Sequence, residues 1–148
     1  FNSEIRFLKL FGKSKIENFS SIKYADSVLN SKLVLCHVPQ TSYTECLFYN
    51  VPTVLIVDDL EDKKIETSFF DTREKKKILK KFLQTNMAFT SHDLAAKFIN
   101  KNWEKIHIWW NNKNVQNARK AYLDNFFATD QNFEKNWTKF INQNLKKI

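Results

Sequence analysis

At 148 residues, the chain is long enough to form one domain that buries a core without help from disulfides or metals. Its two cysteines, Cys36 and Cys46, lie in apolar surroundings with no C-x-x-C pair and no histidine at zinc-site spacing. This excludes a disulfide framework and predicts two reduced thiols of a cytoplasmic protein. The formal charge of +8 suggests nucleic acid or an anionic membrane as a partner. However, the basic residues fall on helical patterns beside acids and amides, which favours helix faces that are simply exposed to solvent.

The first residue is Phe1 and not methionine, and the opening residues form neither a signal peptide nor a spanning helix. We therefore expect a piece of a longer protein whose missing part is N-terminal.

Short apolar runs bounded by polar residues predict strands at 32–37, 53–58 and 87–90, and a weaker pattern predicts one at 15–19. Between the first two lies a helical segment, 41–50, in which Tyr43, Leu47 and Phe48 share one face. The Val51-Pro52 pair ends this helix. Strand, helix and strand form a right-handed crossover, so the two strands are predicted to be parallel neighbours.

Further helices follow along the chain. The segment 71–85 has an apolar stripe and outward lysines, and a second helix begins at Ser91 with Asp93 in its first turn and with Leu94, Ala95, Phe98 and Ile99 buried. From Trp103 the pattern is helical to the end. We predict a single α/β domain over residues 1–148, with a Rossmann-like parallel sheet in 1–100 and a helical C-terminal tail in 101–148.

A polar cluster follows the first of these strands, and its candidate residues are His37, Gln40, Thr41, Ser42, Thr44 and Glu45. In open parallel sheets ligands bind outside the carboxyl ends of the strands, where a helix N-terminus suits a phosphate and a carboxylate accepts hydrogen bonds from a ribose. The alternative is a capping box, because Ser42 to Glu45 reads S-x-x-E. His37 also has two interpretations: it either hydrogen-bonds a ligand or is only the polar residue that ends a strand.

Other polar and aromatic residues favour structural roles. Asp58 and Asp59 are neighbours on a strand and point to opposite faces, so we expect no metal or cofactor site there. The pair Trp109-Trp110, with Ile106, Val115, Tyr122 and Phe126, has the spacing of a stripe that packs the C-terminal helices onto the domain. His92 and His107 have no partner set in sequence. No nucleophile motif is present, so no catalytic residue is assigned.

Several short motifs, taken in their order along the chain, resemble those of a known family. "SVLNSKLVLCHVPQTSYTECLFYNVPTVLI" resembles the donor-site strand, helix and strand of GT-B type glycosyltransferases. "AFTSHDLAAKFIN" and "IHIWWNNKNVQNARKAYLDNFFATDQNFEKNW" are similar to the C-terminal region of a family of bacterial sugar transferases found with surface-polysaccharide genes. The likeness covers about residues 26–141, although the loop lacks the glycines that many GT-B enzymes place near the phosphates.

The resemblance implies a donor-binding domain that holds a nucleotide-sugar, with Thr41, Ser42 and Thr44 at the phosphates and Glu45 at the ribose. It further implies a glycan or lipid-linked acceptor, work at the inner face of the membrane, and a catalytic base in the missing N-terminal acceptor domain. The rival hypothesis is a basic domain without catalysis, which binds nucleic acid or an anionic membrane through the lysines of 75–81. We favour the enzyme over this rival, and we do not expect nucleic acid as a partner.

Overall fold

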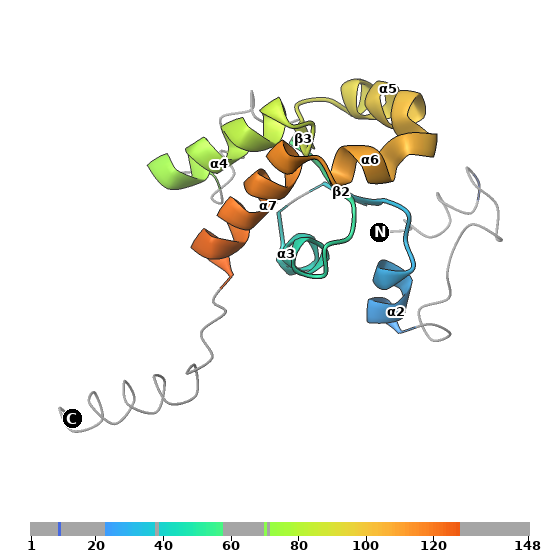
Figure 1. The fold of residues 1–148 in the computed structure, drawn as a ribbon, viewed down its shortest axis with the longest axis horizontal. Coiled ribbons are helices and arrows are strands. Elements are labelled where there is room, and N and C mark those ends of the chain that lie inside the picture. Colours follow the sequence, from blue (N-terminus) through green and yellow to red (C-terminus); the bar gives the residue numbers. More distant parts are fainter. Residues whose placement is uncertain (1–8, 10–22, 38, 58–69, 71, 128–148) are drawn as a thin grey trace.

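The computed structural model describes residues 9, 23–37, 39–57, 70 and 72–127. The predicted strand at 15–19, the end of the predicted strand at Asp58, Trp137 and the last predicted helix lie outside these residues. The described elements, drawn in Figure 1, are α2 (Tyr24–Leu29), β1 (Val34–Cys36), α3 (Thr41–Phe48), β2 (Thr53–Ile56), α4 (Arg73–Gln84), β3 (Ala88–Phe89), α5 (His92–Asn102), the 3-10 helix η4 (Trp103–Lys105), α6 (Ile106–Trp110) and α7 (Lys113–Phe126).

The three strands form a parallel sheet in the order β1-β2-β3, which confirms the predicted crossover and the α/β, Rossmann-like fold class. Val34 pairs with Thr53, and Leu55 pairs with Ala88. Each strand is shorter than the apolar run that predicted it. At the amino end of β1, Val34 N–H donates to the carbonyl of Pro52 (2.8 Å), and Pro52 has no N–H with which the ladder could continue.

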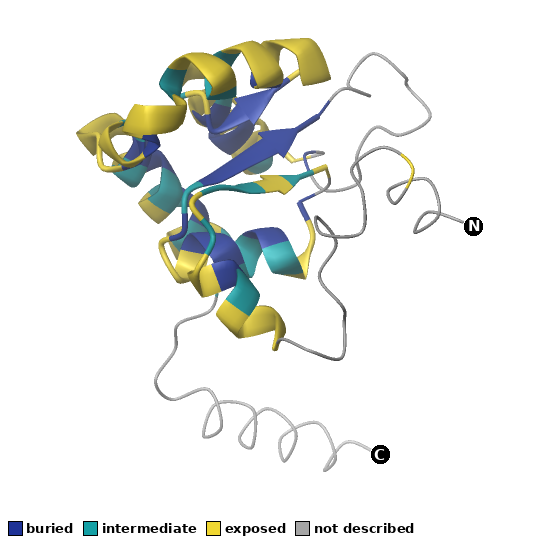
Figure 2. Ribbon diagram, turned by 90° about the vertical axis from the view of Figure 1, so that its right-hand side faces the viewer, coloured by how far each residue is buried: buried dark blue, intermediate teal, exposed yellow. Residues whose placement is uncertain are grey.

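Side chains of β2 alternate between two cores, one on each face of the sheet. Leu55 faces a large core built with α3, α4 and α7, whereas Val54 and Ile56 face a smaller core built with α5. All four residues of β2 are buried, as expected for the central strand of a sheet covered on both faces. Figure 2 shows these buried strands with helices on either side.

Helix α3 places Tyr43, Cys46 and Leu47 in the interior. We predicted that Phe48 shares this buried face, and that prediction is wrong, because its side chain is 44% exposed. The helix ends at Tyr49, and Asn50 adopts a left-handed conformation (φ 60°), which asparagine tolerates better than most residues. Arg119 of α7 then holds this end of α3, since its Nε donates to the carbonyl of Leu47 at 2.6 Å.

The next two helices begin at side-chain caps. Thr72 Oγ1 accepts from Lys75 N–H at the start of α4, and Ser91 Oγ accepts from Leu94 N–H (3.2 Å), which confirms the predicted start of α5. Ala95 is buried as predicted, but Leu94 is 50% exposed, so its predicted burial is wrong. Helix α5 contacts β2, β3, α6 and η4, and Leu94 lies on its solvent-exposed side.

The C-terminal helices complete the large core. Helix α7 lies between α3 and α4 and contacts both (Figure 1). Trp110 Nε1 donates to the backbone and side-chain oxygens of Asn50, and Trp109 Nε1 donates to the carbonyl of Thr85. The predicted packing role of this tryptophan pair is therefore confirmed. Trp103 remains 43% exposed, with the ammonium of Lys32 4.5 Å from its ring centre.

Candidate functional site

The carboxyl ends of the strands bring several predicted site residues to one edge of the sheet. His37 follows β1 directly, α3 begins at Thr41, and α5 begins at His92 soon after β3. Because the strands are parallel, these three points lie at the same edge. The His37 and His92 rings are stacked, with centroids 5.6 Å apart and planes at 23°. This contact joins residues from two different strand ends, and no spacing in the sequence indicated it.

The N-cap of helix α3 lies two residues before Ser42, and the helix begins at Thr41, as the predicted segment 41–50 has it. Gln40 is the N-cap, with extended backbone angles, and its carbonyl already accepts from Thr44 N–H (3.2 Å). Ser42 is therefore the second residue of the helix, and the predicted S-x-x-E capping box is wrong. The Gln40 side chain makes no capping hydrogen bond, and the first turn holds no acidic residue. The positive end of this helix is left without a side-chain cap or an acidic residue in its first turn.

The polar side chains of this first turn are not all equally accessible. Gln40 and Thr41 are exposed, and Ser42 and Glu45 are half-buried. Thr41 and Glu45 are four residues apart, so they lie on the same face of the helix. A ligand bound at the amino end of α3 would thus meet Glu45 one turn further along.

Tyr24 of α2 is a site residue that sequence reasoning missed. Its hydroxyl lies close enough to Ser42 and Glu45 for both side chains to influence its pKa. Burial against α3 raises the pKa of Tyr24, and the neighbouring Cys46 and Glu45 raise this pKa further. No sequence signal near Tyr24 indicates that α2 packs beside α3.

Thr44 turns toward the interior and not toward the edge. Its hydroxyl lies 2.8 Å from the hydroxyl of Tyr122 on α7, and the two share a hydrogen bond. Burial raises the pKa of Tyr122, while this hydrogen bond lowers it. Contact of Thr44 with a ligand stays a prediction, and it requires the hydroxyl to leave Tyr122.

The two cysteines lie next to the site, and they are not joined by a disulfide. Their thiols share a hydrogen bond, which, together with burial, raises the pKa of Cys36 far above its usual range. Cys46 is buried among Val28 and Val51. Both residues thus serve the packing of β1 against α3, as predicted.

Among the described residues, no group of three or more histidine, cysteine, aspartate or glutamate side chains is placed to hold a metal ion. Asp58 and Asp59 lie outside the described residues. Within the same part of the chain, no helix has the length and apolar character needed to span a membrane.

A parallel sheet flanked by helices, with an uncapped helix start at its carboxyl edge, defines a Rossmann-like α/β domain. The sequence matches the family model described as "LIC12162 family transferase" over residues 1–141, and the chain belongs to this family of transferases. No curated protein and no solved structure matches the chain. Membership confirms the transferase class that we predicted, while the glycosyl donor and the GT-B architecture stay predictions.

Proposed function

We propose that this chain is the donor-binding half of a GT-B type glycosyltransferase, which transfers a sugar from a nucleotide-sugar to a surface-glycan acceptor. The observation that carries the proposal is the start of α3, which lies at the carboxyl edge of the sheet with no side-chain cap. Membership of a transferase family supports a group-transfer reaction, and the amino end of a helix is an anion site in many nucleotide-binding domains.

Each site residue then has a role that its position allows. The backbone N–H groups at the start of α3, with the hydroxyls of Thr41 and Ser42, bind the donor phosphates. Glu45 accepts hydrogen bonds from the ribose hydroxyls, and Tyr24 positions Ser42 and Glu45. Gln40 and the stacked His37 border the same edge. The catalytic base comes from the acceptor-binding domain that precedes this half in GT-B enzymes.

The donor site is tested by a thermal-shift panel of UDP, GDP, CMP, dTDP and ADP. At one hundredfold excess over its Kd, a bound nucleotide stabilises the fold by about 2.7 kcal/mol. We expect one nucleotide of the panel to raise the Tm by about 5 to 10 °C. Glu45→Ala and Ser42→Ala should each reduce this shift, because both side chains lie at the start of α3.

The matched control is Glu74→Ala, which removes a glutamate from the first turn of α4, an element outside the site. This variant should keep the full nucleotide shift. The proposal fails if no nucleotide raises the Tm, or if the shift in Glu45→Ala and Ser42→Ala equals that of the unchanged protein.

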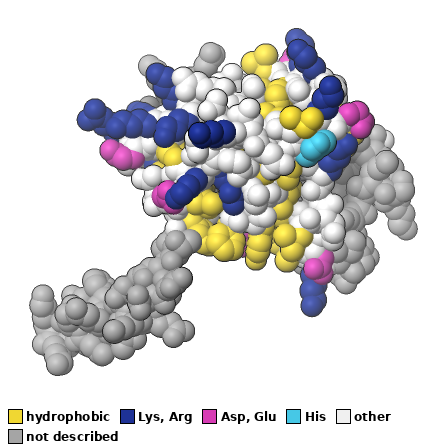
Figure 3. All heavy atoms as spheres, in the orientation of Figure 1, with side chains coloured by type: hydrophobic (Ala, Val, Ile, Leu, Met, Phe, Trp, Pro, Cys, Tyr) yellow, Lys and Arg dark blue, Asp and Glu magenta, His cyan; other side chains and the backbone are white. Residues whose placement is uncertain are grey.

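We also propose that α4 holds the enzyme against an anionic membrane, where a lipid-linked acceptor would be found. Arg73, Lys76, Lys77 and Lys80 are exposed and border one surface depression. Their spacing places them on one helical face, and Figure 3 shows dark blue side chains gathered over α4 at the upper left. Like charges at this spacing repel one another, so an anionic surface that neutralises them is favoured.

This surface is tested by co-sedimentation with vesicles of phosphatidylglycerol and phosphatidylcholine. The triple variant Lys76→Gln, Lys77→Gln, Lys80→Gln should weaken binding about a hundredfold, at about 1 kcal/mol for each lysine. The charge-matched control is Lys97→Gln, Lys101→Gln, Lys105→Gln, on α5 and η4, which should bind as before. Equal losses in both triple variants, or binding to duplex DNA but not to vesicles, would overturn the proposal.

A further inference from the structure

A hollow lies between the end of α4 and the start of α7, on elements other than α3. It has a volume of about 480 Å³ and is lined by Lys81, Gln84, Thr85, Asn86, Trp109, Asn112, Asn114, Val115, Asn117 and Ala118. β3 begins at Ala88, just after Asn86, so the hollow lies at the amino edge of the sheet, opposite the edge that carries the candidate donor site. Its volume falls within the range of about 300–1,000 Å³ that is typical of small-molecule sites.

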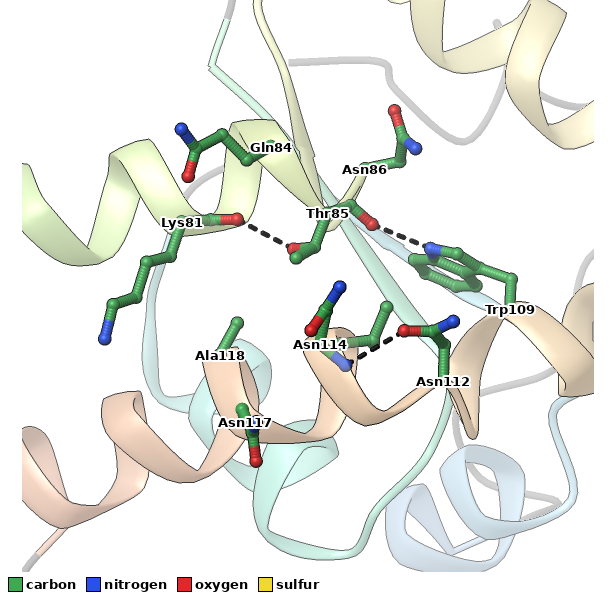
Figure 4. A pocket seen from close by; sticks show the side chains of 10 residues that line it. Lys81, Gln84, Thr85, Asn86, Trp109, Asn112, Asn114, Asn117 and Ala118 are labelled. Atoms are coloured by element: carbon green, nitrogen blue, oxygen red, sulfur yellow. Dashed lines mark hydrogen bonds between the residues drawn. The ribbon is translucent and has the colours of Figure 1, made fainter.

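The two walls of the hollow are held in place by hydrogen bonds. Figure 4 shows the end of α4 on one side and the beginning of α7 on the other. Trp109 Nε1 donates to the carbonyl of Thr85 (2.8 Å), which fixes the indole against the end of α4. Asn112 Oδ1 accepts from Asn114 N–H (2.9 Å), which fixes the start of α7. Such a hollow does not have to be reorganised before a ligand enters.

Five of the ten residues that line this hollow carry side-chain amides. Gln84 and Asn86 come from the end of α4, and Asn114 and Asn117 come from the first turns of α7. None of these four amides hydrogen-bonds another residue in the part of the chain that the structure describes. Each therefore keeps a carbonyl acceptor and two N–H donors for a ligand.

The apolar part of the lining comes from Val115, Ala118 and Trp109. Val115 and Ala118 are almost fully buried in the core beneath α7. The half-buried indole of Trp109 lies beside them and offers an apolar aromatic surface. Among the described residues that line the hollow, Lys81 carries the only charge.

This combination matches the chemistry of a sugar. A hydroxyl both donates and accepts hydrogen bonds, as an amide does, and the C–H groups of a pyranose ring are apolar enough to contact an indole. A phosphate or another strong anion would require more cations than Lys81 alone. We propose that the amide-lined hollow between α4 and α7 binds a neutral carbohydrate, separately from any nucleotide at the start of α3.

The hollow is tested by titrating the ¹⁵N-labelled 148-residue chain with the methyl glycosides of glucose, galactose, mannose and N-acetylglucosamine, monitored by NMR. At least one glycoside should cause saturable shifts of the side-chain amides of Gln84, Asn86, Asn114 and Asn117 and of the Trp109 indole N–H. Resonances of residues 40–45 should not move, which separates this site from the donor site.

The variant Asn114→Ala, Asn117→Ala should raise the Kd for that glycoside at least about tenfold. Alanine is a good helix former, so α7 should stay folded, which circular dichroism checks. Asn125→Ala, on the same helix but outside the hollow, is the control and should leave the Kd unchanged. The proposal is overturned if no glycoside shifts these resonances, if the double variant binds unchanged, or if UMP alone causes the same shifts.

Discussion

Phe82→Ala is expected to lower the free energy of unfolding by about 3–5 kcal/mol, because a buried phenyl ring is lost and a cavity remains. Phe82 is 0% exposed, and its ring contacts Tyr43 of α3 and Tyr122 of α7, with ring centroids 6.1 and 5.6 Å away. The cavity would thus open where α3, α4 and α7 meet. Since whole domains are stable by only about 5–15 kcal/mol, this is a large share of the total.

Urea denaturation followed by circular dichroism measures this loss. Leu94→Ala is the control, because Leu94 is also a large apolar residue on a helix but is 50% exposed. It should change the free energy of unfolding by no more than about 0.5 kcal/mol. A loss below about 1 kcal/mol in Phe82→Ala would show that the three helices do not share one tightly packed core.

Trp110→Ala should also cost about 3–5 kcal/mol, for two separable reasons. The indole is buried in the large core, at 2% exposure. Its Nε1 also donates to both oxygens of Asn50, each at 3.0 Å, and so ties α6 to the turn that precedes β2. Trp110→Phe keeps an aromatic ring but leaves the Asn50 oxygens without this donor, so it should cost about 1–3 kcal/mol.

The same urea experiment distinguishes the two contributions. Trp103→Ala is the matched control, because Trp103 is 43% exposed, and we expect a change of no more than about 1 kcal/mol. Trp110→Phe also removes part of the buried ring, so a loss as large as that of Trp110→Ala would show that a phenyl ring restores none of the packing of the indole.

The sequence predicted the larger elements well, because their patterns are local. The apolar runs around Val34 and Thr53 enclose a short helical segment, and such a crossover allows only parallel neighbours. Ser91 was a correct helix start, because its hydroxyl needs only the N–H of Leu94, three residues away. Ile106 and Trp110 of the predicted stripe are buried on α6, and Val115 and Tyr122 are buried on α7, so helical spacing held within each helix although the two helices are separated at Asn111-Asn112.

The candidate site was predicted only in outline. His37, Gln40, Thr41 and Ser42 do follow a strand whose carboxyl end lies at a helix start. However, the S-x-x-E pattern placed the cap at Ser42, whereas the helix begins at Thr41, as the predicted segment 41–50 has it, with Gln40 as its N-cap. The turn around Pro39 and Gln40, where Pro39 is buried, decides where α3 begins.

What the sequence by itself determined was the alternation of strands and helices, the parallel crossover and the apolar face of each long helix, because these depend on residues a few positions apart. The tertiary structure alone decided the contacts between distant segments: Thr44 with Tyr122, His37 with His92, and Trp109 with Thr85. Such contacts depend on how the helices cross the sheet, and that geometry is set by the packing of the whole core.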